Sequence, residues 1–181
     1  MPIEISSDTP PALIPLAWLI GRWEGAGVVG YPTMDEVRFG QELEFRHDGR
    51  PFLHYTSQTW LLDDEGNQVR PLASESGYWR VPQGADEPAH AELNAEAQQP
   101  GSDVEVLLSH PTGFSEIYVG RVSGARIDLV TDMVARTGTA KEYTAAQRMY
   151  GLVEGDLMWV MDMAAVGQEM QAHASARLKK V

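Results

Sequence analysis

Apolar and polar residues alternate along most of the chain, a pattern typical of β-strands that bury one face and expose the other. The clearest stretch is 37–46, which carries an apolar or amide side chain at every odd position and a charged residue or glycine at every even one. Turn-forming triplets such as His47-Asp48-Gly49 and Glu154-Gly155-Asp156 separate such stretches. The pattern therefore predicts strands connected by hairpins.

About ten stretches have this character, and no amphipathic helix long enough for a βαβ unit lies between them. The strands are expected at 21–32, 37–46, 52–62, 72–81, 104–110, 114–122, 126–134, 139–153, 157–165 and 172–181. We therefore predict an all-β fold, an antiparallel up-and-down β-barrel, because closing the sheet removes its exposed edges. A barrel of about ten strands is wider than side chains alone can fill, so a ligand cavity is expected.

The remaining segments set the expected domain limits. Residues 1–11 are polar and contain prolines, which predicts a flexible N-terminal tail. The stretch 12–20 is expected to form a short helix that leads into the barrel. Residues 82–103 are acidic and poor in apolar anchors, so a long solvated hairpin loop is expected there. The prediction is a single barrel domain over residues 12–181.

The composition excludes several classes of binding partner and of metal site. The 181 residues carry a formal net charge of −12, which repels phosphate backbones and anionic membranes, so neither nucleic acid nor a membrane is an expected partner. The chain contains no cysteine, which excludes disulfides and thiolate metal sites. The apolar run 12–20 is too short to span a bilayer and is not preceded by basic residues. A cytoplasmic location is expected.

The glycines of the stretch 21–32 follow a spacing that needs a reason. Gly21, Gly25 and Gly27 share one strand face with Trp23 and Val29. Glycine is a poor strand former, so a bend, a bulge, or a backbone or ligand lying close to that face would explain the pattern. One interpretation is a kinked first strand with Trp23 plugging an end of the barrel. A ligand-contacting strand is the other.

This stretch resembles the G-x-W-x-G-x-G-x-G-x-Y-P signature of the nitrobindin family, which are haem-binding, fatty-acid-binding-protein-like (lipocalin-like) β-barrels. The matching residues are Gly21, Trp23, Gly25, Gly27, Tyr31 and Pro32. The chain departs from the signature at Val29, with a glycine one place later at Gly30. The similarity continues through 74–79, 112–113, 140–142 and 170–173, and so covers nearly the whole chain from Leu16 onward.

The resemblance implies a haem b (iron) cofactor with His173 as the axial ligand. A neutral imidazole nitrogen is a strong donor to haem iron, and a backbone carbonyl of the preceding loop is expected to hold the other ring nitrogen. The resemblance also implies that Thr33 lies near the haem and that Lys141 meets a haem propionate. Some relatives carry a distal histidine where this chain has Leu72 and Ala73, which predicts an apolar distal pocket.

The activity implied by the resemblance is that of a peroxynitrite isomerase. Ferric haem would react with nitric oxide and isomerise peroxynitrite to nitrate, with iron as the Lewis acid and His173 as the metal ligand. The alternative is a non-enzymatic carrier of a fatty acid or another small hydrophobic ligand. Such a carrier needs a buried arginine for the carboxylate, and Arg148 and Arg177 are the candidates. The sequence leaves open whether the chain forms a homodimer.

The other histidines and the methionines offer weaker candidates. His47 and His90 are expected to be exposed, His110 to lie at the rim, and His54 to lie within a strand where it could face the cavity. Five methionines crowd the C-terminal third and could line a cavity or simply fill the core. They are Met149, Met158, Met161, Met163 and Met170.

Overall fold

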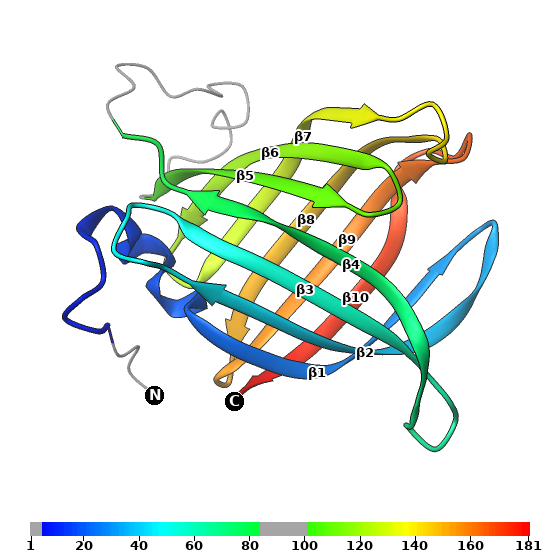
Figure 1. Cartoon of the computed structure of the whole chain (residues 1–181), viewed down its shortest axis with the longest axis horizontal. Helices are drawn as coiled ribbons and strands as arrows, with labels where there is room; N and C mark the ends of the chain where they lie inside the picture. The colour runs from blue at the N-terminus through cyan, green and yellow to red at the C-terminus, as the bar shows by residue number, and fades with distance from the viewer. Residues whose placement is uncertain (1–4, 84–100) are drawn as a thin grey trace.

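The strands of the chain close into one antiparallel barrel. The structure is a computed structural model that describes residues 5–83 and 101–181. Its described residues form ten strands, in the spatial order β1-β10-β9-β8-β7-β6-β5-β4-β3-β2 (Figure 1). The strands are β1 (Gly21–Tyr31), β2 (Met34–Arg46), β3 (Leu53–Leu62), β4 (Gln68–Arg80), β5 (Ser102–His110), β6 (Phe114–Ser123), β7 (Arg126–Arg136), β8 (Tyr143–Val153), β9 (Asp156–Ala165) and β10 (Gln171–Lys180).

The barrel is closed by β1, which pairs with β2 on one side and with β10 on the other. The glycines of β1 make this close packing possible. A Cβ added to Gly27 would lie 2.1 Å from the Ser175 carbonyl oxygen of β10 and 2.6 Å from the ring of Phe39. Of the explanations that the glycine spacing allowed, a neighbouring backbone lying close to the strand is thus confirmed.

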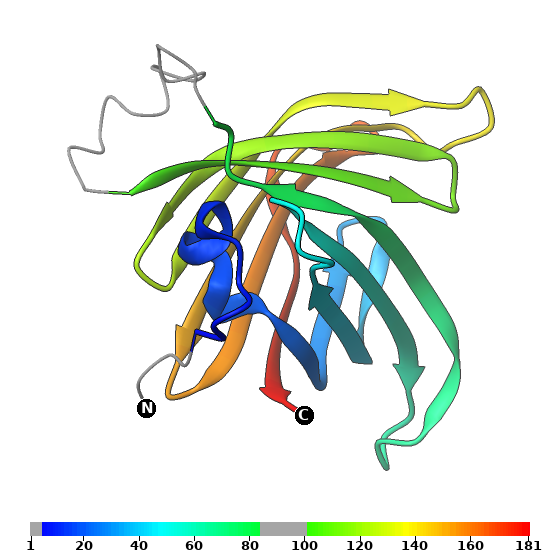
Figure 2. The ribbon, with the colours of Figure 1, turned by 60° about the vertical axis from the view of Figure 1, so that its left-hand side comes forward.

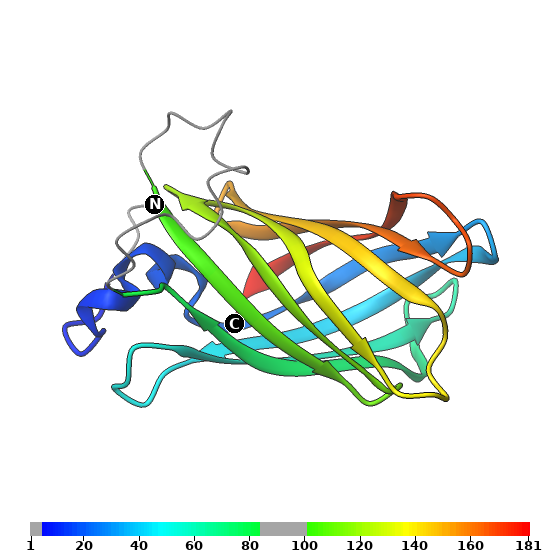
Figure 3. The ribbon, with the colours of Figure 1, turned by 90° about the horizontal axis from the view of Figure 1, so that it is seen from above.

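The two ends of the barrel differ. The helix η1 (Pro11–Leu19), a 3-10 helix, covers the end at which β1 begins (Figures 1 and 2). There Trp23 is buried and donates its indole N–H to the Leu19 carbonyl at 2.8 Å, so Trp23 does plug this end. The other end carries the β1–β2, β3–β4, β5–β6, β7–β8 and β9–β10 connections, and we call it the mouth (Figure 3).

The alternation predicted for 37–46 is confirmed. Phe39, Gln41, Leu43 and Phe45 are buried, whereas the charged residues between them are exposed or partly exposed. Buried aromatic side chains dominate the helix-proximal half of the interior. Its largest buried members are Trp23, Phe45, Tyr55, Trp79 and Tyr150.

Some predicted boundaries were wrong for local reasons. β4 begins at Gln68 rather than at residue 72, because Pro71 sits opposite a bulge at Thr59/Trp60, where a missing ladder donor is tolerated. β8 begins at Tyr143 rather than at residue 139, because a turn closed by the Ala140 N–H and the Thr137 carbonyl precedes it. β5 begins at Ser102, two residues earlier than predicted.

Two predicted segments fall partly outside the described residues. They are the tail 1–11, of which residues 1–4 are not described, and the loop 82–103, of which residues 84–100, including His90, are not described. Within the described residues, no helix is long and apolar enough to cross a membrane.

Candidate functional site at the barrel mouth

His173 lies where the pairing of β10 becomes irregular. The β10 residues Ala172 and Ala174 pair with Asp162 and Met161 of β9, so His173 is an extra residue in a β-bulge. A bulge bends the strand and re-aims a side chain that a regular ladder would fix, and such features are frequent next to active sites. The side chain of His173 is thus directed by the bulge, near the start of β10 and hence near the mouth.

The ring of His173 is held by a backbone carbonyl. Its Nδ1 lies 3.0 Å from the carbonyl oxygen of Gly30. Because a carbonyl only accepts, Nδ1 carries the proton, and Nε2 keeps its lone pair. The prediction of a carbonyl partner is confirmed, but the carbonyl belongs to β1 and not to the loop before β10.

The environment keeps this imidazole neutral. Burial lowers the pKa of His173, the bond to the Gly30 carbonyl raises it, and the charge of Arg148 lowers it again, with a net downward shift. Within the described residues, Nε2 has no hydrogen-bond partner. A neutral imidazole with one nitrogen anchored and the other free is the arrangement that a metal-ligating histidine requires.

The side chains toward the mouth are mostly apolar and only partly buried. They are Val29, Leu72, Phe114, Val134, Met161, Met163 and Ala174. An apolar surround with a few convergent polar groups is typical of a cofactor site. The methionine cluster is only partly involved, because Met149, Met158 and Met170 are exposed and do not belong to the core.

Thr33 and Lys141 lie at the same end as His173. Thr33 is an exposed residue of the β1–β2 turn, and Lys141 is exposed in the β7–β8 connection, just outside β8. Both therefore lie at the mouth with His173. A role for them in holding a cofactor stays a prediction.

His54 does not face the interior. It lies between the inward-facing Leu53 and Tyr55, and its ring packs against Phe52 and the exposed Tyr78 on the outer face. The expectation that it could line the cavity was therefore wrong. His47 sits in the β2–β3 turn, where its Nδ1 accepts the Gly49 N–H at 3.3 Å.

A buried polar network lies inside the barrel, and the sequence analysis missed it. Arg148 donates from Nη1 and Nη2 to the two carboxylate oxygens of Glu75, at 2.8 and 2.9 Å. Its Nη2 also reaches Glu116 at 3.3 Å, and its Nε donates to the Tyr118 hydroxyl at 2.9 Å. Such a bidentate pair is among the stronger hydrogen-bonded contacts in proteins.

Two further side chains of the network contact Glu116. Tyr143 donates its hydroxyl to Glu116, and His110 lies 2.8 Å from the same carboxylate through Nε2. His110 ends β5 as predicted, but its side chain is only 12% exposed and stacks on Phe114, so it is part of the interior rather than a free rim residue.

The network keeps the Glu75 carboxylate ionised. Burial alone would raise the pKa of Glu75, but the charge and hydrogen bonds of Arg148 lower it to about 2. Burial raises the pKa of Tyr118 and Tyr143 far above the usual range, so both phenols stay protonated donors. The sequence did indicate this network, because alternate residues of a strand face the same side. Glu75 lies two residues before Gly77 and four before the buried Trp79, so its charged side chain points into the barrel.

The ligand atoms of Glu75, His110 and Glu116 lie within 4.8 Å of one another, a spacing that suits a metal ion. Both oxygens of Glu75 already accept from the Arg148 guanidinium, whose positive charge occupies the place of a cation. We therefore interpret this cluster as an ion-pair network.

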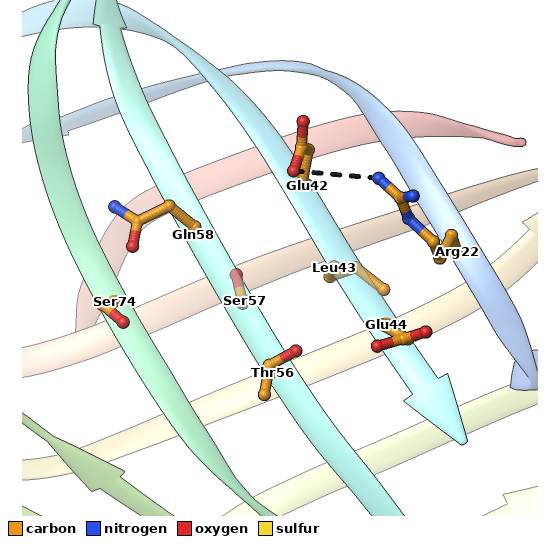
Figure 4. A pocket seen from close by; sticks show the side chains of 8 residues that line it. All are labelled: Arg22, Glu42, Leu43, Glu44, Thr56, Ser57, Gln58 and Ser74. Atoms are coloured by element: carbon orange, nitrogen blue, oxygen red, sulfur yellow. Dashed lines mark ion pairs between the residues drawn. The ribbon is translucent and has the colours of Figure 1, made fainter.

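A depression of about 370 Å³ lies on the outer face of the barrel, over β1 to β4 (Figure 4). It is lined by polar side chains that include Arg22, Glu42, Thr56 and Gln58. Arg22 and Glu42 form a long ion pair of 4.0 Å across it. The depression faces away from the interior and contains none of the residues around His173.

Comparison with known proteins agrees with this geometry. A family model described as the THAP4-like, heme-binding beta-barrel domain matches residues 12–180. The chain belongs to this family. Family membership makes this a haem-binding barrel domain, and the free Nε2 of His173 fits that cofactor chemically.

Individual relatives cover the whole length. A ferric nitrobindin-like protein of Kineococcus radiotolerans is 54% identical over 100% of this chain and 99% of its own. A peroxynitrite isomerase of Leifsonia xyli subsp. xyli is 49% identical over 98% of each chain. The crystal structure of Rv2717c from M. tuberculosis superimposes with a TM-score of 0.75 at 36% identity, covering 98% of this chain and 99% of that one.

Proposed function

We propose that this barrel binds haem b through Nε2 of His173, and that the ferric haem reacts with nitric oxide and isomerises peroxynitrite to nitrate. The observation that carries the proposal is the state of the imidazole. Nδ1 is anchored on the Gly30 carbonyl, and Nε2 is unengaged within the described residues, beside a partly buried apolar surround. Relatives named peroxynitrite isomerase, at 42–49% identity over nearly full length, support the choice of reaction.

Each residue at the mouth has a part that follows from its chemistry. His173 would supply the axial nitrogen, and the Gly30 carbonyl would fix its orientation and increase its basicity. The apolar side chains around it would limit the access of water. Lys141 would meet a propionate at the exposed rim, with Thr33 near the haem at the β1–β2 turn. When bound, the ferric haem would supply a Lewis acid toward the oxygen atoms of peroxynitrite.

Among the described residues, the positions where some relatives carry a distal histidine offer no polar side chain. Leu72 is partly buried against the core, and Ala73 is exposed and bonded through its N–H to the Thr59 hydroxyl. The interior imidazole of His110 is engaged with Glu116. This pocket would therefore favour small ligands such as nitric oxide over ligands that need a strong distal donor.

The carrier alternative finds little support. Arg148 is buried as such a carrier needs, but Glu75 and Glu116 already neutralise it. Arg177 is about half exposed and pairs with Glu154 and Asp156 on the outer face. Within the described residues, neither arginine offers a free charge to a fatty-acid carboxylate.

The test is reconstitution with haem. Wild-type protein should acquire a Soret band, and His173→Ala should lose it while keeping the far-ultraviolet spectrum of a folded barrel. Stopped-flow measurement should show faster conversion of peroxynitrite to nitrate by the reconstituted wild type than by His173→Ala. Wild-type protein that never acquires the band would end the proposal, and haem-loaded protein that leaves the conversion unchanged would remove the isomerase part of it.

A further inference from the structure

Tyr31 connects β1 to β9 across the start of β10. It is the last residue of β1, and its side chain is buried at 7% exposure. Its hydroxyl accepts the Ala165 N–H at 3.0 Å and donates to the Met163 carbonyl at 2.9 Å. In the barrel order β10 lies between β1 and β9. The phenol therefore spans the strand that carries His173.

The ring of Tyr31 also contacts the ring of His173. The two ring centroids are 5.6 Å apart, and the planes meet at 89°, an edge-to-face arrangement. The side chain of Tyr31 is fixed at both ends, by its own backbone and by its hydroxyl on β9. The phenol ring is rigid between those points, so the wall that it presents to the imidazole is fixed as well.

Gly30 and Tyr31 are consecutive residues that constrain the imidazole in two ways. The Gly30 carbonyl takes the Nδ1 proton, and the Tyr31 ring limits rotation of the imidazole about its χ2 bond. The χ2 torsion of histidine is broad and roughly two-fold, so an unsupported ring can exchange the positions of its two nitrogens. A support on each side removes that freedom before any cofactor binds.

We propose that Tyr31 is a positioning residue that holds His173 in the orientation with Nε2 directed at the haem iron. The inference rests on the proposed function of His173. It extends that function by giving a role to Tyr31, a residue of the Tyr31-Pro32 motif that does not itself bind the cofactor. Tyr31 acts through the orientation of His173 and does not itself touch the iron.

If Tyr31 had only a structural role, removing its hydroxyl would lower stability without disturbing His173. Thr131 provides the matched control. The Thr131 hydroxyl also bridges two strands, accepting the Ala146 N–H at 3.1 Å and donating to the Ala146 carbonyl at 3.4 Å. Tyr31→Phe and Thr131→Val each remove a bridging hydroxyl and keep the side-chain shape. Both should lower the stability of the fold, but only Tyr31→Phe should disturb His173.

The experiment reads the tautomer of His173 in haem-free protein by nitrogen-15 NMR, at about pH 8, where the imidazole is neutral. Wild type and Thr131→Val should show one tautomer, protonated at Nδ1, and Tyr31→Phe should show a mixture. In haem-loaded protein, Tyr31→Phe should release haem about tenfold faster than either control, the lower end of the effect expected for an outer-shell partner of a metal ligand. A Tyr31→Phe protein with the wild-type tautomer and haem release rate would overturn the inference.

The wild-type protein gives a second test that does not depend on whether Tyr31→Phe folds. If Tyr31 and His173 act together, haem binding should slow hydrogen exchange at the Ala165 amide more than at the Ala146 amide, because coupling between two sites is reciprocal. Equal slowing at both amides would overturn the inference. The tautomer result is independent of haem, so it stands even if His173→Ala retains the Soret band and the proposed function fails.

Discussion

The imidazole of His173 and the carbonyl of Gly30 meet where the ladder between β1 and β10 ends. The last regular pair is Val29 with Ala174, and the next acceptor in line, the Gly30 carbonyl, takes the His173 Nδ1 proton at 3.0 Å. The pairing of each strand with its other neighbour is irregular too: β1 shifts register against β2 between Val29 and Tyr31, and β10 shifts against β9 between Ala172 and Ala174. Because the regular pairing stops here, the Gly30 carbonyl is free to accept from Nδ1 of His173 and so orients the imidazole.

This relationship predicts rescue of a truncated ligand by free imidazole. His173→Gly should bind haem poorly, and adding imidazole should restore the Soret band, because the Gly30 carbonyl and the Tyr31 ring still shape the vacated site. Absorbance titration of His173→Gly with imidazole measures the effect. His54→Ala, on the outer face, is the control and should bind haem as the wild type does. A His173→Gly protein that needs no imidazole would show that another residue ligates the iron.

The close packing of β1 against β10 predicts a large cost for one methyl group. Gly27→Ala should lower the free energy of unfolding by about 3 kcal/mol, because its Cβ would meet the Ser175 carbonyl oxygen at 2.1 Å, and neither backbone moves easily. Urea denaturation gives the value. Gly138→Ala meets nothing within 4 Å and should change stability by less than about 0.5 kcal/mol. Equal costs for both variants would contradict the packing argument.

The fold could be predicted from the sequence largely because its strands follow a strict period of two. The stretch 37–46 shows its buried face in its odd positions, and the turn triplets mark the hairpins. The errors lie where local chemistry gives no periodic signal. Pro71 suggests a break and is instead accommodated at a bulge, and residues 139–142 continue an extended pattern that the Thr137 turn interrupts.

The candidate site was only partly predictable. Resemblance singled out His173, and chemistry required an acceptor for its other nitrogen. That acceptor lies on β1, which depends on a strand register that one sequence does not reveal. The pairing of Glu75 with Arg148 joins residues 73 positions apart, so only the folded barrel brings them together. What the sequence did contain was the inward parity of both residues. Glu75 shares its parity with the buried Trp79, and Arg148 shares its parity with the buried Ala146 and Tyr150.

The depressed pKa of Glu75 predicts a pH dependence of stability. Its folded pKa of about 2 lies below the ordinary value of 4.5, so the unfolded chain binds this proton first as the pH falls. The stability that Glu75 contributes is therefore present above pH 4.5 and is lost as the pH falls toward 2. Glu75→Gln should lower the free energy of unfolding by about 3 kcal/mol near neutral pH. The difference from the wild type should become progressively smaller as the pH falls below 4.5.

Urea denaturation of wild type and Glu75→Gln at several pH values gives the comparison. Glu105→Gln is the control, because Glu105 pairs with Arg80 at 2.9 Å on the surface and should contribute less than about 1 kcal/mol. A difference between wild type and Glu75→Gln that stays constant through the acid range would show that Glu75 is not held ionised by Arg148.

Arg148 also predicts an effect on stability, because it pairs with two buried carboxyl groups at once. Arg148→Met should lower the free energy of unfolding by about 3–5 kcal/mol, since Glu75 and Glu116 would stay buried without their cation. The double variant Glu75→Gln with Arg148→Met leaves one fewer unpaired charge. Its cost should therefore fall short of the sum of the two single costs, by at least about 1 kcal/mol in a double-mutant cycle. Additive costs would show that the two side chains do not stabilise each other.

The same Arg148→Met protein separates the interior network from the mouth. His173 is held by the Gly30 carbonyl and the Tyr31 ring, and neither contact passes through Arg148. Folded Arg148→Met protein should therefore acquire the Soret band at saturating haem, even though its midpoint in urea is lower. Loss of the band in a protein that is still folded would show that the buried charges also shape the haem site, and that stability and cofactor binding share one network in this barrel.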